Sequence, residues 1–335
     1  MSPDKPTIIA ITPVRNEAWV LDAYLACTST WADYIIIADQ HSTDGSREIA
    51  AKYDKVICVD NPNEEMNQAE ARRILFREVD KIVGDKIVFA IDADEFLSEG
   101  FAQTRSWGDI IHSRPNQIFC FKWVNVYGDF SHVLPFRESK YMEWVCHLDS
   151  TLSLEEEYNK RERHAIHECR IPCFSAEECS YQMIDEIQFI HLARLNLIRT
   201  KNKEDFYQVS TIDKRKEYIS SVSLYRSYHH HYRIEELSHP MRLLSKDMNT
   251  DYSILVHQGD IGDYYIKEIA SIIKRRTIKP FKSIDIWNNQ YLKQENIFYN
   301  PAIGIRMFFE YLRKTTPIAG HKWVKIIDKI LKRFI

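Results

Sequence analysis

The stretch that decides the fold runs from Ile87 to Glu95 and reads Ile-Val-Phe-Ala-Ile-Asp-Ala-Asp-Glu. Its apolar half, rich in β-branched and aromatic residues, predicts a buried strand that leads directly into acidic residues. Alternation along a strand would send Asp92 and Asp94 to the same side. Two carboxylates at such a short distance repel each other unless they share a proton or a cation. The stretch therefore predicts a site for a divalent ion that bridges to the phosphates of a ligand, although two solvated aspartates in a turn would give the same pattern.

Apolar runs of the same kind recur on both sides of this strand, and helical patterns separate them. Alternating strands and helices predict an α/β fold with a mostly parallel, Rossmann-type sheet that is flanked by helices. The predicted strands cover residues 7–14, 34–39, 55–60, 86–92 and 117–125. The predicted helices cover residues 16–30, a short segment through Ile49 to about Tyr53, and residues 66–83.

Three of the predicted strands end in polar clusters, at 13–17, 39–41 and 92–95. Ligands of open α/β sheets bind beyond the carboxyl ends of the strands, so we expect these clusters to converge on one edge. Asp39 can accept hydrogen bonds from a base or a ribose there. The residues after it, Ser42-Thr43-Asp44-Gly45, also fit a simple helix cap and turn.

Four segments together resemble the family 2 glycosyltransferases, and their order and spacing agree over the first third of the chain. They are Thr12-Pro13-Val14-Arg15-Asn16-Glu17, Asp39 to Ser46, Ala71-Arg72-Arg73 and Phe89 to Glu95. Arg15 stands where that family usually has Tyr or Phe. Gln40 and His41 also depart from its pattern, which leaves the role of the family's second aspartate open.

The resemblance implies a GT-A-like fold and an inverting transfer from a nucleotide-sugar donor, expected to be a UDP-sugar. It places Asp39 and Asp92 at the nucleoside and Arg72 near the nucleotide. It also implies that Asp94, with Asp92, holds Mn²⁺ or Mg²⁺. Pro13, Arg15 and Glu17 would line the base pocket.

The acceptor side offers weaker signals. The Asp-Ala-Asp-Glu form with a later His167-Glu168 is similar to a branch of the family that builds bacterial lipopolysaccharide core and capsular glycans, which implies a glycan or lipid-linked acceptor. Glu168 is the candidate general base, because inverting transfer needs a carboxylate near the acceptor hydroxyl. A surface glutamate is the alternative, and Asp149 and Asp260 are the next candidates. His191 could complete the metal's coordination, touch the diphosphate, or be an ordinary core histidine.

Other clusters fit less specific interpretations. His164, His167, Cys169, Cys173 and Cys179 supply zinc-ligand types without a familiar zinc spacing. Arg137 and Arg194 could neutralise phosphate or form ordinary ion pairs, and His229 to His231 fit an exposed helix face.

Two rival functions stay open. A nucleotidyltransferase would share the sheet and the carboxylates, but it would be expected to carry a Gly-rich loop after the first strand, and residues 13–17 contain no glycine. The other rival is a nucleotide-sugar or glycan-binding protein that has lost turnover.

Length and composition indicate a globular protein that stays in the cytoplasm. The chain has 335 residues, 44% of them apolar, and a net charge of −3, which is not that of a nucleic-acid binder. The first apolar run is too short for a signal peptide, no apolar stretch reaches 18 residues, and the seven cysteines are expected as thiols. We predict a donor-binding half over 1–125, an acceptor-side lobe over 126–230 and a helical C-terminal extension over 231–335.

The C-terminal tail differs from the rest of the chain. Residues 301–335 carry eight Lys and Arg against Glu310 and Asp328, a net charge of +6. From Lys322 onward, apolar residues recur at spacings of three and four, and lysines occupy the positions between them. This pattern predicts a peripheral helix on the inner face of the plasma membrane, or else a helix that packs on the protein's own core or on a second subunit.

Overall fold

The computed structural model describes residues 5–64, 67–134, 142–148, 151–159, 170–172, 179–214, 234–239, 241–243, 254–257, 261–276, 279–281, 284, 286–287, 289–295, 297 and 322–331. The chain divides into two compact units. The first comprises residues 1–196 and 233–258, and the second comprises residues 197–232 and 259–335. The functional division predicted at residues 125 and 230 stays a prediction.

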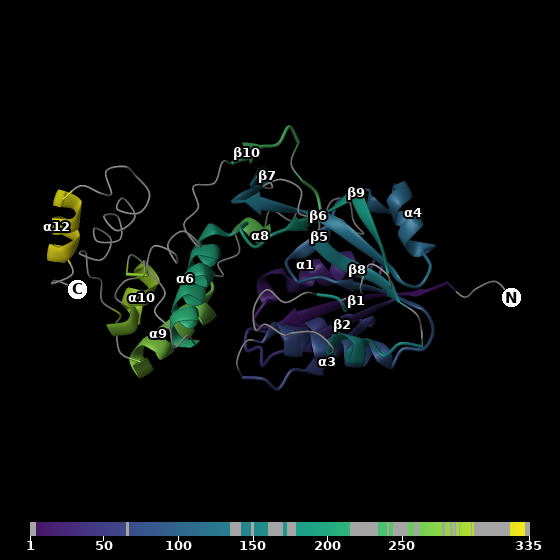
Figure 1. The fold of residues 1–335 in the computed structure, drawn as a ribbon, viewed down its shortest axis with the longest axis horizontal. Helices are drawn as coiled ribbons and strands as arrows, with labels where there is room; N and C mark the ends of the chain where they lie inside the picture. The colour runs from purple at the N-terminus through teal and green to yellow at the C-terminus, as the bar shows by residue number, and fades with distance from the viewer. Residues whose placement is uncertain are drawn as a thin grey trace. The chain divides into compact units, whose positions relative to one another are not determined.

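The first unit opens with the predicted alternation of strands and helices (Figure 1). The strands pair in parallel in the order β3-β2-β1-β4, so the predicted α/β fold is confirmed. The elements are β1 (Thr7–Val14), α1 (Ala18–Thr28), β2 (Tyr34–Asp39), α2 (Ser46–Ala50), β3 (Val56–Asp60), α3 (Gln68–Asp80) and β4 (Lys86–Ala90).

Beyond β4 the sheet becomes mixed. β8 joins β4 antiparallel, β6 joins β8 antiparallel, and β9 lies parallel to β6 and antiparallel to the short β5. These elements are β5 (Glu95–Leu97), η1 (Phe101–Gln103), α4 (Arg105–Ile111), β6 (Gln117–Tyr127), β7 (Asp129–Leu134), β8 (Met142–Leu148), α5 (Leu154–Asn159), β9 (Ser180–His191), β10 (Glu235–Glu236) and α8 (Ile254–His257). The central sheet is therefore parallel over β1 to β4, where strands alternate with helices, and mixed beyond β4.

Two apolar clusters cover the two faces of the sheet, with α1 on one side and α3 on the other (Figure 1). Alternation along β1 divides its residues between them. Ile8 and Ala10 join the cluster that contains α1, and Ile9 and Ile11 join the cluster that contains α3. A strand that is buried on both faces has no polar side, which is why β1, β2 and β4 read as continuous apolar runs. Packing on both faces holds these strands in place in the sheet, and it therefore also determines where their carboxyl ends lie.

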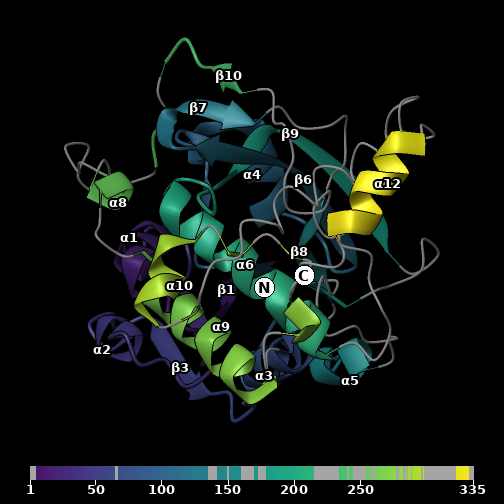
Figure 2. The ribbon, with the colours of Figure 1, turned by 90° about the vertical axis from the view of Figure 1, so that its left-hand side faces the viewer.

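The second unit is helical in its described part. α6 (Leu197–Lys214) lies beside α9 (Asp263–Arg276), as both views show (Figures 1 and 2). Asn289 caps α10 (Gln290–Gln294) and donates to Asn202 and Asp205 of α6 at 2.7 and 2.8 Å. The remaining elements are η2 (Lys279–Phe281) and α12 (Lys322–Leu331). Within the described residues, no helix has both the length and the apolar character that crossing a bilayer requires.

Candidate functional site

The loops that follow β1 and β2 form one hydrogen-bonded unit. Thr43 N donates to Asn16 Oδ1 at 2.8 Å, and Asn16 N donates to Ser42 Oγ at 2.9 Å. Asn16 and His41 both have a positive φ, 57° and 53°, which turns the chain sharply at each strand end. Asp44 accepts hydrogen bonds from Ala18 N and Ser46 N, so it serves the first turns of both α1 and α2. The capping prediction for this segment thus describes part of its role.

Asp39, the last residue of β2, is buried beneath this loop pair with only 2% of its surface exposed. Its Oδ2 accepts from Arg47 Nη1 at 3.1 Å and from Ser42 N at 3.3 Å. Its Oδ1 is buried and makes no hydrogen bond with the described residues. An unsatisfied buried carboxylate oxygen costs free energy, so a ligand N–H or O–H that reached this oxygen would be favoured.

The other residues predicted at the base pocket surround the same strand ends. Arg15 Nη1 donates to the backbone oxygen of Glu64 at 2.9 Å, which ties the β1 loop to the segment before α3. Glu17 Oε2 accepts from Trp19 Nε1 at 2.6 Å, and Pro13 lies half-buried near the end of β1. The structure therefore brings Pro13, Arg15 and Glu17 to the edge where Asp39 lies, with Glu17 already bonded to a core tryptophan.

The Asp-x-Asp segment departs from the sequence prediction in one respect. β4 ends at Ala90, and Asp92 to Glu95 form a turn in which Glu95 N donates to Asp92 O at 3.1 Å. Asp92 N in return donates to Glu95 Oε2 at 2.9 Å. The prediction of a strand through Asp92 was wrong, since the backbone forms a turn there that hydrogen bonds between Asp92 and Glu95 close. Strand alternation therefore does not orient Asp92 and Asp94.

Two arginines hold Asp92. Arg72 Nη2 donates to its Oδ1 and Arg170 Nη2 to its Oδ2, each at 2.7 Å. Arg72 reaches the site from α3 and also donates to the backbone oxygen of Ile11 at 3.3 Å. Burial lowers the pKa of Arg72, and the Asp92 carboxylate opposes that effect. Arg72, which the resemblance places near the nucleotide, forms an ion pair with Asp92, and its contact with a nucleotide stays a prediction.

Sequence reasoning missed Arg170 and Glu95. Both oxygens of Glu95, which is wholly buried, accept from the Arg170 guanidinium. Burial raises the pKa of Glu95, and Arg170 opposes the rise. Burial alone would lower the pKa of Arg170, but Asp92 and Glu95 outweigh it and raise that pKa. No motif near residue 170 signals the contact, since its partners lie about 75 positions earlier in the chain.

Asp94 faces His191, the last residue of β9. His191 Nε2 lies 3.5 Å from Asp94 Oδ2, and His191 Nδ1 lies 2.7 Å from Asn125 Oδ1. The ring also stacks on Trp123, with centroids 4.2 Å apart. When Nδ1 carries the hydrogen that is donated to Asn125 Oδ1, Nε2 has a lone pair that points toward the Asp94 carboxylate. Two acceptors that face each other repel, and a cation between them removes this repulsion.

The two predicted metal ligands Asp94 and His191 are therefore neighbours, although they lie 97 positions apart. A carboxylate and an imidazole are ligand types that Mn²⁺ accepts. Among the residues that the structure describes, no group of three or more His, Cys, Asp and Glu is placed to hold a metal ion. The pair fits a cation that takes its remaining ligands from a bound diphosphate.

Several predicted residues lie outside the described part of the chain. They are Glu168, its alternatives Asp149 and Asp260, Arg137, His229 to His231, and four of the five residues considered for zinc, His164, His167, Cys169 and Cys173. Cys179, the fifth, is buried in the apolar cluster beside α3. Arg194 follows β9, and its backbone oxygen accepts from Gly128 N at 3.0 Å.

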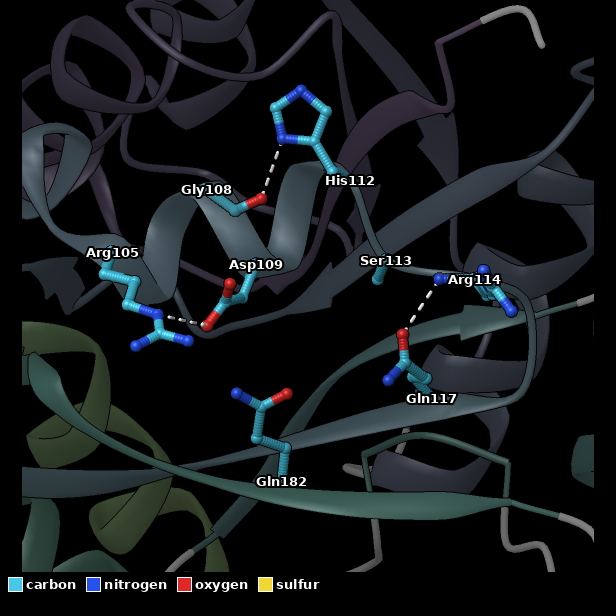
Figure 3. Close-up of a pocket in the computed structure, with 8 residues that line it drawn as sticks. All are labelled: Arg105, Gly108, Asp109, His112, Ser113, Arg114, Gln117 and Gln182. Carbon is cyan, nitrogen blue, oxygen red and sulfur yellow. Dashed lines mark hydrogen bonds and ion pairs between the residues drawn. The ribbon is translucent and has the colours of Figure 1, made fainter.

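A separate pocket of about 600 Å³ lies at the other end of the strands (Figure 3). Gln117 at the start of β6 pairs with His147, which pairs with Ile87 near the start of β4, whereas Asp92 follows the end of β4. The pocket is lined by Arg105, Gly108, Asp109, His112, Ser113, Arg114, Gln117 and Gln182. None of these was predicted as a site residue.

Comparison with known families finds a match in the first third of the chain. Residues 9–104 match the family described as Glycosyl transferase family 2. This span contains most of β1, all of β2 to β4, the Asp92–Glu95 turn and all four sequence segments on which the resemblance rests. The bacterial lipopolysaccharide and capsule branch is not identified by this match, and no curated protein is matched.

Solved structures show only distant likeness. Mannosyl-3-phosphoglycerate synthase from Rubrobacter xylanophilus is 19% identical, with 36% of this chain and 41% of that chain aligned and a TM-score of 0.27. Glucosyl-3-phosphoglycerate synthase from Mycobacterium tuberculosis in complex with Mn²⁺, uridine-diphosphate and phosphoglyceric acid is 23% identical, with 36% and 43% aligned and a TM-score of 0.26. CTP:phosphocholine cytidylyltransferase from Streptococcus pneumoniae is 12% identical, with 56% and 93% aligned and a TM-score of 0.31. The alignment spans less than half the length of the two synthases, and TM-scores this low add nothing to the assignment.

Proposed function

We propose that this protein is an inverting glycosyltransferase that moves a sugar from a nucleotide-sugar donor, a UDP-sugar, to a hydroxyl of a glycan or lipid-linked glycan in bacterial surface polysaccharide synthesis. The observation that carries the proposal is the arrangement at the carboxyl ends of β1, β2 and β4. Asp39, the Arg72–Asp92 pair and Asp94 lie there, within the residues that match glycosyl transferase family 2.

The nucleoside of the donor binds at the ends of β1 and β2. Asp39 accepts a hydrogen bond from the base or the ribose through Oδ1, which the protein's described residues leave without a donor. Pro13, Arg15 and Glu17 form the adjoining wall. Arg72 contributes positive charge near the nucleotide, moderated by its ion pair with Asp92.

The diphosphate binds next to the Asp92–Glu95 turn. Asp94 and His191 would hold Mn²⁺ or Mg²⁺ there, and the bound ion supplies neutralisation of the negative charge that develops on the departing nucleoside diphosphate. His191 is oriented for this by Asn125 and Trp123. Bonds to the second ring nitrogen are the usual means by which a protein aims a metal-binding histidine.

Glu168 acts as the general base in this scheme. Its carboxylate takes the proton of the acceptor hydroxyl as the hydroxyl oxygen forms a bond to the anomeric carbon, and the bond from that carbon to the diphosphate oxygen breaks with its electron pair on the leaving group. Attack opposite to the leaving group inverts the configuration. Arg170, two residues later, contacts Asp92 and Glu95, which supports a place for this segment beside the donor.

We also infer that the protein works at the cytoplasmic face of a membrane and contacts it through α12. Trp323, Ile326 and Ile330 are 47%, 52% and 48% exposed and recur at helical spacing. Lys322 and Lys329 on the same helix are exposed as well. Exposed apolar side chains beside lysines favour an anionic lipid surface over the interior of a protein as the partner.

Titration calorimetry with UDP, with and without Mn²⁺, together with donor turnover, tests the proposal. We expect Mn²⁺ to raise the affinity of the wild type for UDP, and we expect Asp94→Asn to lose that increase and to turn over donor at least about a hundredfold more slowly. Asp109→Asn, which alters an exposed carboxylate of the separate pocket, should behave as wild type.

Three results would count against the proposal. Unchanged metal dependence and turnover in Asp94→Asn would remove the metal site. Release of diphosphate from a nucleoside triphosphate and a sugar phosphate would instead indicate a nucleotidyltransferase. Tight UDP binding without turnover of any donor would indicate a binding protein that has lost catalysis.

A further inference from the structure

We propose that Arg170 is a positioning residue that locks the Asp92–Glu95 turn and thereby aims Asp94 at the metal. The proposal rests on the function proposed above. It also assigns different tasks to the two aspartates of the Asp-x-Asp segment. Asp92 anchors the turn to two arginines, and Asp94 is the carboxylate that takes the cation.

The Arg170 guanidinium spans the whole turn. Nη2 contacts Asp92 Oδ2 at 2.7 Å and Glu95 Oε1 at 2.9 Å, Nη1 contacts Glu95 Oε2, and Nη1 lies 3.5 Å from the backbone oxygen of Ala90. These partners stand before, within and at the end of the turn. A planar fork with several donors can hold all of them at once, which a lysine cannot do.

Glu95 transmits this hold to the backbone. Its Oε2 accepts both from Arg170 and from Asp92 N, and its own N donates to Asp92 O. Glu95 is wholly buried, so its carboxylate depends on these donors. Loss of Arg170 would leave a buried carboxylate without its cation, and the turn would rearrange to relieve it.

Asp94 lies inside the locked turn, so the direction of its side chain follows the turn's geometry. Its backbone oxygen accepts from Leu192 N at 2.8 Å, which places it next to His191 on β9. Each carboxylate oxygen of Asp92 receives an arginine. A cation that approached Asp92 would have to displace one of them.

The neighbouring residue fixes Arg170 itself. Ile171 is fully buried in the apolar cluster that includes Tyr158 and Cys179, so the backbone at this point is anchored by packing. The guanidinium is 15% exposed, so most of it is buried beside the turn.

The experiment compares Arg170→Gln with Arg170→Lys and measures the affinity for Mn²⁺ at saturating UDP, the affinity for UDP without metal, and the unfolding temperature. We expect Arg170→Gln to weaken Mn²⁺ binding by about tenfold to a hundredfold, with metal-free UDP binding unchanged within about twofold. The Mn²⁺ affinity of Arg170→Lys should lie between those of the wild type and Arg170→Gln, since lysine keeps the positive charge but lacks the planar guanidinium. Arg77→Gln, which removes an arginine paired with Glu155 on the surface, is the matched control and should leave every quantity unchanged except a small shift in stability.

A double variant separates positioning from stability. Arg170→Gln with Glu95→Gln removes both buried charges, so we expect it to regain unfolding temperature relative to Arg170→Gln while Mn²⁺ binding stays weak. A folded Arg170→Gln or double variant with wild-type Mn²⁺ affinity would overturn the proposal, and so would an equal loss of metal-free UDP affinity. If the wild type binds neither UDP nor Mn²⁺, the proposed function fails instead.

Discussion

Each aspartate at the strand ends meets a different basic side chain, and this difference sets its expected role. Asp39 pairs with Arg47, Asp92 with Arg72 and Arg170, and Asp94 faces His191. Equivalent substitutions should therefore have unequal effects. Removal of the charge of Asp92 should disturb the Asp92–Glu95 turn, whereas removal of the charge of Asp39 should weaken binding of the nucleoside.

For Asp39, we expect Asp39→Asn to weaken UDP binding by about tenfold to a hundredfold, because a hydrogen bond to a charged, buried acceptor contributes about 1.5–3 kcal/mol. Calorimetry at fixed Mn²⁺ measures this. Asp60→Asn is the matched control, since Asp60 shares Arg47 with Asp39 but is 75% exposed. Equal effects of the two variants, or normal UDP affinity in Asp39→Asn, would contradict the placement of the nucleoside.

For Glu168, loss of a general base should lower kcat by about 10² to 10⁴ while UDP affinity stays constant. Glu168→Gln keeps the shape of the side chain and removes its basicity, and Glu156→Gln alters an exposed glutamate of α5 as a control. A kcat with acceptor within a few-fold of wild type would place the base elsewhere, with Asp149 and Asp260 as the next candidates.

At the scale of elements, α3 carries Arg72 to the site and begins at a cap. Asn67 Oδ1 accepts from Glu70 N at 3.2 Å. We expect Asn67→Ala to lower the free energy of unfolding by about 1 kcal/mol, because it leaves a helix N–H without its partner. Denaturant titration measures the change, and Asn67→Asp should retain most of the stability because it keeps the acceptor. Loss of stability in both variants alike would show that the side-chain cap is not the cause.

The contribution of α3 to the site is Arg72, which is buried and paired with Asp92. The Asn67 cap at the start of α3 instead accepts from Glu70 of the same helix. Both Asn67 variants should therefore keep UDP affinity near that of wild type at temperatures where they are folded.

At the scale of the whole molecule, the proposed membrane contact of α12 can be tested directly. We expect the full chain to co-sediment with vesicles of mixed neutral and anionic lipid, less so as salt rises, because each basic residue near such a surface contributes about 1 kcal/mol. Ile326→Asp with Ile330→Asp should abolish binding, whereas Val83→Asp, at a site 92% exposed in the other compact unit, should not. Absence of vesicle binding by the wild type would contradict the membrane proposal and favour a protein partner for α12.

Local residue pattern by itself determined much of this protein. The alternation of apolar and amphipathic runs predicted β1 to β4 and their helices, because a strand buried on both faces must be apolar throughout. It also predicted that Asp39, Asp92 and Asp94 lie at the ends of strands whose carboxyl ends meet at one edge of a parallel sheet. Their neighbours in the chain were enough for that inference.

Only the tertiary structure decided what each of these side chains meets. The end of β4 at Ala90 depends on the Glu95 carboxylate, and Arg170 reaches that carboxylate from about 75 positions away. His191 approaches Asp94 because β9 pairs with β5, a register that no local pattern encodes. Hydrogen bonds and ion pairs form between groups that are near in space, and chain folding brings together residues whose separation in sequence carries no record of the contact.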